Sequence, residues 1–124
     1  MTEKEQFIIE LKKRTKRFAV DSIKFVGSLK KCKASDVVTY RFIKSSTSTG
    51  ANYRAVCRAR SKAEFYSKIC IVVEEVDETL FWLEIIDESD LSKDTSELNR
   101  LTQEATELTM IMSKAKDSAS KYNK

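Results

Sequence analysis

The residues best suited to chemistry are carboxylates near the middle of the chain. Glu74 and Glu75 are adjacent, and Glu78 lies three residues beyond Glu75, on the same side of a helix. Paired carboxylates can serve acid–base catalysis, or can hold two metal ions in a helical bundle together with Glu-x-x-His motifs. The sequence contains no histidine, so that metal motif and His-based triads are excluded. We therefore predict no catalytic residue, no metal site and no cofactor, and expect Glu75 and Glu78 to pair with Arg41, Lys44 or a neighbouring subunit's lysine.

Three cysteines, Cys32, Cys57 and Cys70, are the other residues with reactive side chains. Their number is odd, no two of them form a C-x-x-C pair, and no histidine could complete a zinc site. A disulfide framework is therefore not expected. We interpret all three as reduced thiols that fill small gaps in the core.

The composition favours a single, mostly helical domain. The 124 residues include no proline and only two glycines, with 34% charged and 41% apolar residues. Sandwiches, barrels and wound α/β sheets need more turn residues than this. The N-terminus lacks the pattern of a secretory signal, and the longest aliphatic run, 69–73, is far shorter than the ~20 residues of a membrane span. We expect one domain over residues 1–124, no membrane partner and a cytoplasmic location.

Apolar residues recur every three or four positions in four segments, which predicts helices at about 3–31, 35–60, 61–87 and 94–121. Capping signals open the last two segments, because Ser61 precedes Glu64 and Asp94 precedes Glu97 by three residues. Four such helices with short connections pack as an antiparallel up-down four-helix bundle, and we predict this all-α fold. The expected inward stripes include Phe7, Leu11, Thr15, Phe18, Ser22 and Phe25; Val38, Phe42, Tyr53 and Val56; Ile69, Val72, Val76 and Leu83; and Leu98, Leu101, Leu108, Met112 and Tyr122.

The second segment contains a run of small residues, Ser45-Ser46-Thr47-Ser48-Thr49-Gly50, that would favour a loop on propensity alone. The apolar spacing nevertheless continues through it, from Phe42 to Tyr53. Small side chains also allow two helices to approach closely. We therefore predict that this run is helical.

The outward side of the third segment is less polar than the outside of a monomeric bundle would be. Ile71, Trp82 and Ile85 lie opposite the inward stripe, with Phe81 beside them. Burying a large apolar side chain is worth about 1.5–3 kcal/mol, so we expect this side to meet another subunit. The alternative is a wide apolar stripe that wraps around the core of one subunit. The candidate interface residues are Ile71, Glu74, Glu78, Phe81, Trp82 and Ile85.

Charge is unevenly distributed along the chain, whose formal net charge is +4. Residues 1–33 carry +6, residues 34–68 carry +5, residues 69–100 carry −8 and residues 101–124 carry +1. The basic side of the first helix could be an ordinary solvated face, could meet the acidic third helix and steer assembly, or could bind the phosphates of RNA or DNA. The candidate nucleic-acid contacts are Lys12, Lys13, Lys16, Arg17, Lys24 and Lys31.

Three stretches resemble a known family. They are Ser48-Thr49-Gly50-Ala51-Asn52-Tyr53-Arg54-Ala55, Phe65-Tyr66-Ser67-Lys68 and Glu75-Val76-Asp77-Glu78-Thr79-Leu80-Phe81-Trp82-Leu83. In order and spacing they are similar to the bacterial four-helix bundle proteins, also called 23S ribosomal RNA intervening-sequence proteins, over nearly the whole chain. The resemblance implies a bundle that assembles into a ring-shaped homopentamer, and it does not imply an activity.

A related branch of this family supplies accessory proteins of diversity-generating retroelements, whose basic pentamer binds a reverse transcriptase and nucleic acid. The resemblance thus implies that RNA, DNA or a protein could be a partner. We interpret the signature residues as packing residues rather than a ligand site, with Trp82 anchoring a subunit contact and Asn52 bonded to a backbone group or to Glu75. The signature residues are Asn52, Tyr53, Glu75, Glu78, Thr79, Trp82 and Leu83.

Overall fold

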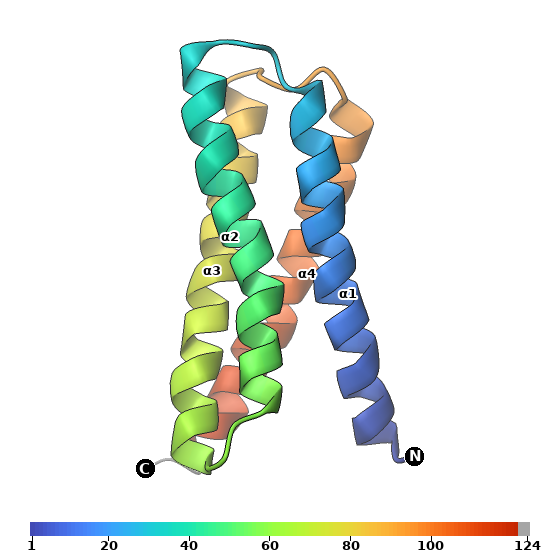
Figure 1. Cartoon of the computed structure of the whole chain (residues 1–124), viewed down its shortest axis with the longest axis vertical. Helices are drawn as coiled ribbons and strands as arrows, with labels where there is room; N and C mark the ends of the chain where they lie inside the picture. The colour runs from blue at the N-terminus through green and yellow to red at the C-terminus, as the bar shows by residue number, and fades with distance from the viewer. Residues whose placement is uncertain (122–124) are drawn as a thin grey trace.

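The computed structural model describes residues 1–121, and this part of the chain contains four long helices (Figure 1). Consecutive helices run in opposite directions, so the N-terminus lies at the same end of the bundle as the end of the fourth helix (Figure 1). The predicted all-α, antiparallel up-down four-helix bundle is confirmed. Tyr122, predicted on the fourth inward stripe, lies outside the described residues. The helices are α1 (Glu3–Phe25), α2 (Lys33–Cys57), α3 (Lys62–Glu88) and α4 (Thr95–Ser120), with a short 3₁₀ turn η1 (Val26–Ser28) after α1.

Each long helix begins at a side chain that accepts a hydrogen bond from a free backbone N–H. Ser61 accepts from the backbone of Glu64, and Asp94 from the backbone of Glu97, both at 3.0 Å. These two caps were predicted from the sequence and are confirmed. Thr2 and Cys32 cap α1 and α2 in the same way.

The core is formed by the predicted inward stripes of all four helices. Phe25 and Phe42 pack edge to face within it, with 6.2 Å between their ring centroids. Phe7, in the second turn of α1, is an exception because it is 55% exposed. The N-terminal part of α1 diverges from the other helices (Figure 1). No described helix is long and apolar enough to cross a membrane. Fully buried large side chains include Phe18, Phe42, Ile69, Leu83, Leu101 and Met112.

The first helix ends at Phe25, well before the predicted end near residue 31. The chain tightens into η1, where the Ser28 hydroxyl donates to the Phe25 carbonyl oxygen at 2.7 Å. The prediction is wrong here because the next residues leave the helix to pair with another loop, and Lys31 therefore lies in a loop rather than on α1. The other helix ends agree with the predicted bounds to within three residues.

The two loops at this end of the bundle are hydrogen-bonded to each other. The backbone N–H of Lys30 donates to the Leu91 carbonyl oxygen at 2.8 Å, and that of Lys93 donates to the Ser28 carbonyl oxygen at 3.1 Å. Leu29 and Leu91 are both buried. These loops therefore close this end of the core.

The run of serine and threonine residues in the middle of α2 is helical, as predicted. Its hydroxyls donate to carbonyl oxygens one turn earlier, as Thr47 does to Ile43 at 2.7 Å and Thr49 to Ser45 at 2.9 Å. These bonds provide partners for polar groups that lie in the interior of the bundle.

Helices α1 and α2 approach closely at Gly50 and Thr15. A Cβ atom placed on Gly50 would lie 3.3 Å from the carbonyl carbon and oxygen of Thr15. Thr15 and Thr49 are both fully buried beside this point. The missing side chain of Gly50 therefore lets the backbone of α1 pack directly against α2.

Replacing Gly50 with valine should destabilise the protein by roughly 1–3 kcal/mol, the usual cost of overpacking. The obstructing atoms of Thr15 belong to the backbone and cannot rotate away. The measurement is the free energy of unfolding from urea denaturation followed by circular dichroism. The matched control is Ala51→Val at the next, exposed position, which should change stability by only about 0.5 kcal/mol. Equal losses in both variants would contradict the importance of the close approach.

Candidate interaction surfaces

The outward side of α3 carries exposed apolar side chains between carboxylates. Ile71 is 42% exposed and Phe81 is 49% exposed, and Glu74 and Glu78 are exposed between them. These positions follow one another at steps of three and four residues, so they form one stripe along the helix. We call the set Ile71, Glu74, Glu78 and Phe81 the outer stripe of α3.

Trp82 and Ile85 are more covered than the sequence suggested. Both pack partly against the core, whereas the sequence placed them with Ile71 opposite the inward stripe. The reason is that α2 and α4 contact α3 on its two sides, which covers side chains at the flanks of the helix. The wide-stripe alternative therefore applies to Trp82 and Ile85, while Ile71 and Phe81 face outward.

The Trp82 indole is positioned by two neighbours on its own helix. Its Nε1 donates to the Glu78 carboxylate at 3.1 Å. The Phe81 ring meets it edge to face, with 5.0 Å between the ring centroids. An ordered aromatic pair bordered by carboxylates is suited to contact an apolar surface that carries positive charge.

The carboxylates of α3 do not form the expected ion pairs within the chain. Among residues 1–121, neither Glu75 nor Glu78 pairs with Arg41 or Lys44. Glu78 accepts from the indole of Trp82 instead, and Glu75 feels Lys44 only at longer range. Burial raises the pKa of the Glu75 carboxyl, and the charge of Glu78 raises it further. Within the same residues, no group of three or more acidic or cysteine side chains could hold a metal ion.

Four of the signature residues lie in the packed part of the bundle. Thr79 and Leu83 are fully buried, and the Thr79 hydroxyl donates to a backbone carbonyl oxygen one turn earlier at 2.8 Å. Burial raises the pKa of the Tyr53 phenol. The Asn52 side-chain amide donates to the Ser48 carbonyl oxygen at 2.8 Å, which is the backbone partner that the sequence left open as one alternative.

The basic residues of the first helix are exposed but do not form one site. Lys12 and Lys16 line a hollow of about 200 Å³ between α1 and α2, together with Arg54 of α2. Lys13 lies apart from it and pairs with Glu10 at 3.9 Å. Arg54 was not among the predicted contacts, because its contribution depends on how α1 and α2 pack. The residues of the prediction that do not line the hollow are Lys13, Arg17, Lys24 and Lys31.

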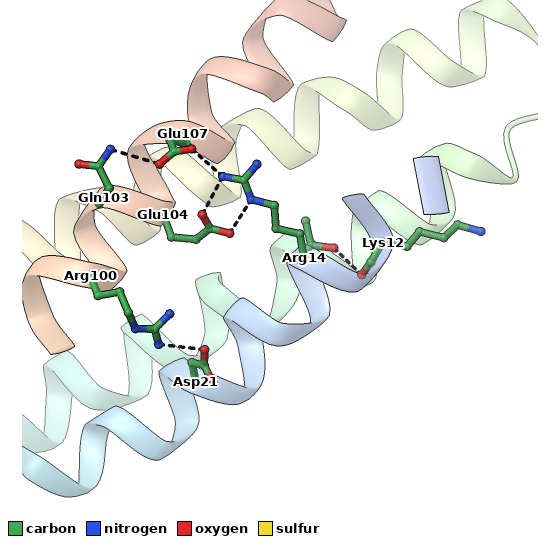
Figure 2. A network of polar contacts seen from close by, with 8 residues as sticks. Lys12, Arg14, Asp21, Arg100, Gln103, Glu104 and Glu107 are labelled. Atoms are coloured by element: carbon green, nitrogen blue, oxygen red, sulfur yellow. Dashed lines mark hydrogen bonds and ion pairs between the residues drawn. The ribbon is translucent and has the colours of Figure 1, made fainter. Parts of the chain in front are cut away.

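Two arginines connect α1 to α4 (Figure 2). Arg14 of α1 donates to both carboxylate oxygens of Glu104 at 2.7 Å and to Glu107 at 2.9 Å. Arg100 of α4 donates to Asp21 at 2.9 Å. The bidentate pair of Arg14 with Glu104 fixes orientation as well as distance. The bond with Glu104 also raises the pKa of Arg14, which keeps it charged. From the sequence, Arg14 is recognisable only as part of the N-terminal positive charge.

An apolar groove of about 750 Å³ lies beside the N-terminal part of α1. The buried part of its lining includes Leu11, Val56 and Ile69. All the charged residues among its described lining residues are lysines. We call it the lysine-rimmed groove. This groove was not predicted from the sequence, because Phe7 was expected on the inward stripe. The exposed and half-buried part of the lining includes Lys4, Phe7, Ile8, Lys12, Ile111 and Lys114.

The three cysteines are free, and one of them differs from the prediction. Cys57 and Cys70 are partly buried, whereas Cys32 is exposed. The Cys32 sulfur caps α2 by accepting from the backbone N–H of Ser35 at 3.4 Å, so it does not fill a gap in the core. The backbone and side-chain hydrogen bonds of Ser35 lower the pKa of the Cys32 thiol, which favours the reactive thiolate.

Comparison with known proteins finds a helical relative without an assigned role. No family model matches the sequence, and no curated protein matches it. Among solved structures, a protein with unknown function from the S23 ribosomal protein family of Bacteroides thetaiotaomicron VPI-5482 is similar, with a TM-score of 0.72 and 26% sequence identity. The match covers 85% of this chain and 96% of that chain. The shared fold therefore extends over most of the bundle.

Cys32 should react with iodoacetamide faster than Cys57 and Cys70 below the pH at which an ordinary thiol ionises. A lowered pKa means that more thiolate is present in the folded protein at such a pH than in the urea-unfolded chain. The measurement is the alkylation rate of each cysteine against pH, followed by mass spectrometry. Ser35→Ala removes the side-chain hydrogen bond and should move the Cys32 profile part of the way to higher pH. Three identical profiles would contradict the assignment.

Proposed function

We propose that this chain is a non-enzymatic, homo-oligomeric four-helix bundle protein of the 23S ribosomal RNA intervening-sequence type, which acts in the cytoplasm by binding other macromolecules. The proposed assembly is a homopentamer. The sequence resemblance supports this family. The structural neighbour from the S23 ribosomal protein family, itself of unknown function, supports it independently.

The observation that carries the proposal is the outer stripe of α3. Ile71 and Phe81 are exposed on a helix whose opposite side is already packed in the core. Full burial of such a side chain is worth about 1.5–3 kcal/mol. Covering both in a contact between copies therefore favours the assembled state over separate subunits, and every copy contributes the same stripe.

The chemistry of the α3 carboxylates favours binding over catalysis. Glu78 is engaged by the Trp82 indole, and the raised pKa of Glu75 has burial as its main cause. A raised pKa of this origin follows from packing and needs no catalytic role. The sequence also has no histidine to act as the second acid or base near neutral pH.

A second candidate function is that of a basic RNA- or DNA-binding accessory factor, for example the partner of a retroelement reverse transcriptase. The observation that favours it is the convergence of Lys12, Lys16 and Arg54 on one hollow between α1 and α2. Three cations from two helices around a small concave surface suit a backbone phosphate better than cations spread along one helix.

Replacing Phe81 with aspartate should shift the assembly to smaller species, because it places a charge in the contact that buries the outer stripe. Sedimentation velocity and light scattering measure the change, and circular dichroism verifies the fold. The control is Met110→Asp, a 62% exposed apolar position on α4, which should leave the assembly unchanged. Trp82→Ala should also reduce the assembly, although its half-buried indole supports the subunit as well. An unchanged oligomer in Phe81→Asp would contradict the proposed interface.

If nucleic acid is the partner, binding should weaken steeply as salt rises, since counterions are released from the phosphates. Fluorescence anisotropy with labelled RNA and DNA oligonucleotides measures the affinity at several salt concentrations. Changing Lys12, Lys16 and Arg54 together to glutamine should lower the affinity and flatten the salt dependence. Lys93→Gln, in the loop at the closed end, serves as the control. The accessory-factor function would be abandoned if no oligonucleotide bound at low salt.

A further inference from the structure

Two surfaces of the subunit have complementary chemistry. The lysine-rimmed groove is apolar inside and bordered by Lys4, Lys12 and Lys114. The outer stripe of α3 is apolar at Ile71 and Phe81 and bordered by carboxylates. Both surfaces therefore present exposed apolar side chains, and the charges at their borders are opposite in sign.

We propose that the outer stripe of α3 in one copy docks into the lysine-rimmed groove of the next copy, so that the subunits associate head to tail. The inference rests on the homo-oligomer proposed above, and it names the two surfaces that meet. It assigns the groove to a second copy of this chain.

The charges support this pairing. Helix α3 contains eight acidic and two basic residues, whereas all the charged residues among the described lining of the groove are lysines. Within residues 1–121, none of Lys4, Lys12 and Lys114 forms an ion pair, and neither Glu74 nor Glu78 does. Both sets of charges are therefore available for a contact between copies. Complementary charges of this kind select the partner and its register.

The size of the groove allows several occupants, and the outer stripe decides between them. Its volume of about 750 Å³ falls within the roughly 300–1,000 Å³ of sites for small molecules, so an anionic amphiphile such as a fatty acid would also fit. A fatty acid, however, would leave Ile71 and Phe81 exposed. A second copy covers the groove and the outer stripe in one contact.

The positions of the two surfaces require a head-to-tail contact. Helices α1 and α3 lie on opposite sides of the bundle, because each packs between α2 and α4. The groove opens beside α1, and the outer stripe faces away from the core on α3. Joining a stripe to a groove leaves a free groove on one copy and a free stripe on the other. Repetition of this contact gives a closed ring when the rotation from one subunit to the next adds up to a full turn.

The test uses two variants that each damage one surface. The groove variant combines Phe7→Asp with Lys114→Glu, and the stripe variant combines Ile71→Asp with Phe81→Asp. All four positions are exposed, so the bundle should persist in both variants, as checked by circular dichroism. Both variants gain negative charge, so the two damaged surfaces repel each other and cannot restore the ring.

Each variant alone should sediment as a monomer, because every contact then includes one damaged surface. An equimolar mixture should form a one-to-one heterodimer of twice the 14.2 kDa subunit mass, since one intact groove meets one intact stripe. The heterodimer should not grow further, because its two free surfaces are the damaged ones. Labelling one variant with a fluorophore identifies the mixed species in sedimentation velocity. Should a double variant misfold, Lys4→Glu with Lys114→Glu replaces the first and Phe81→Asp alone replaces the second.

Three results would overturn the head-to-tail contact while leaving the homo-oligomer in place. The first is a folded groove variant that assembles like the wild type. The second is a pair of monomeric variants that do not combine when mixed. The third is a wild-type assembly that binds dodecanoate in the groove without dissociating, because the groove would then be open between subunits. A wild-type protein that is itself monomeric would instead remove the proposed function, and this inference with it.

Discussion

The close approach of α1 to α2 at Thr15 and Gly50 is the contact on which the shape of the bundle depends. On the C-terminal side of this point α1 stays packed against α2, where Phe25 and Phe42 meet edge to face. Arg14, adjacent to Thr15, ties the same turn of α1 to Glu104 of α4 with two 2.7 Å hydrogen bonds. The first helix is therefore fixed to both of its neighbours near Thr15, and Asp21 connects it to Arg100 of α4 further towards its C-terminal end. Its N-terminal part moves away from both neighbours (Figure 1), and the groove opens there.

The two ends of the bundle differ because, in the part of the chain that the structure describes, only one of them is closed by loops that are hydrogen-bonded to each other. At one end the backbone of Lys30 bonds to Leu91, and the buried side chains of Leu29 and Leu91 complete the core. At the other end, no loop within residues 1–121 is hydrogen-bonded across the bundle beside the first turns of α1, and Phe7 remains more than half exposed. The α1–α4 seam also relies on charged bridges, which orient two helices without filling the space between them. An apolar hollow beside the start of α1 follows from this arrangement.

The sequence predicted those features that depend on local spacing. The inward stripes follow from periodicity, and the run 45–50 was correctly assigned to a helix because its apolar spacing outweighs its low propensity. The features it missed depend on residues far apart in the chain. The early end of α1 is caused by bonds between loops about sixty residues apart. The groove depends on how α1 diverges from its neighbouring helices, and this angle cannot be predicted from the spacing of apolar residues. Cys32 was wrongly predicted to fill a gap in the core, because sulfur is rarely considered as a helix cap. Trp82 was expected to face outward, but neighbouring helices cover the flanks of α3.

The separation of charge between α1 and α3 has a physical meaning in this fold. Had the opposite charges of α1 and α3 served mainly to hold the subunit together, these two helices would be neighbours. They instead lie on opposite sides of the bundle, and α1 takes its partners from α4, through Arg14 with Glu104 and Asp21 with Arg100. The carboxylates of the outer stripe and the lysines of the groove thus form no ion pairs within the described chain, and they lie on different sides of the bundle. Opposite fields on opposite sides do little for an isolated subunit, but they give identical copies a preferred orientation when they meet.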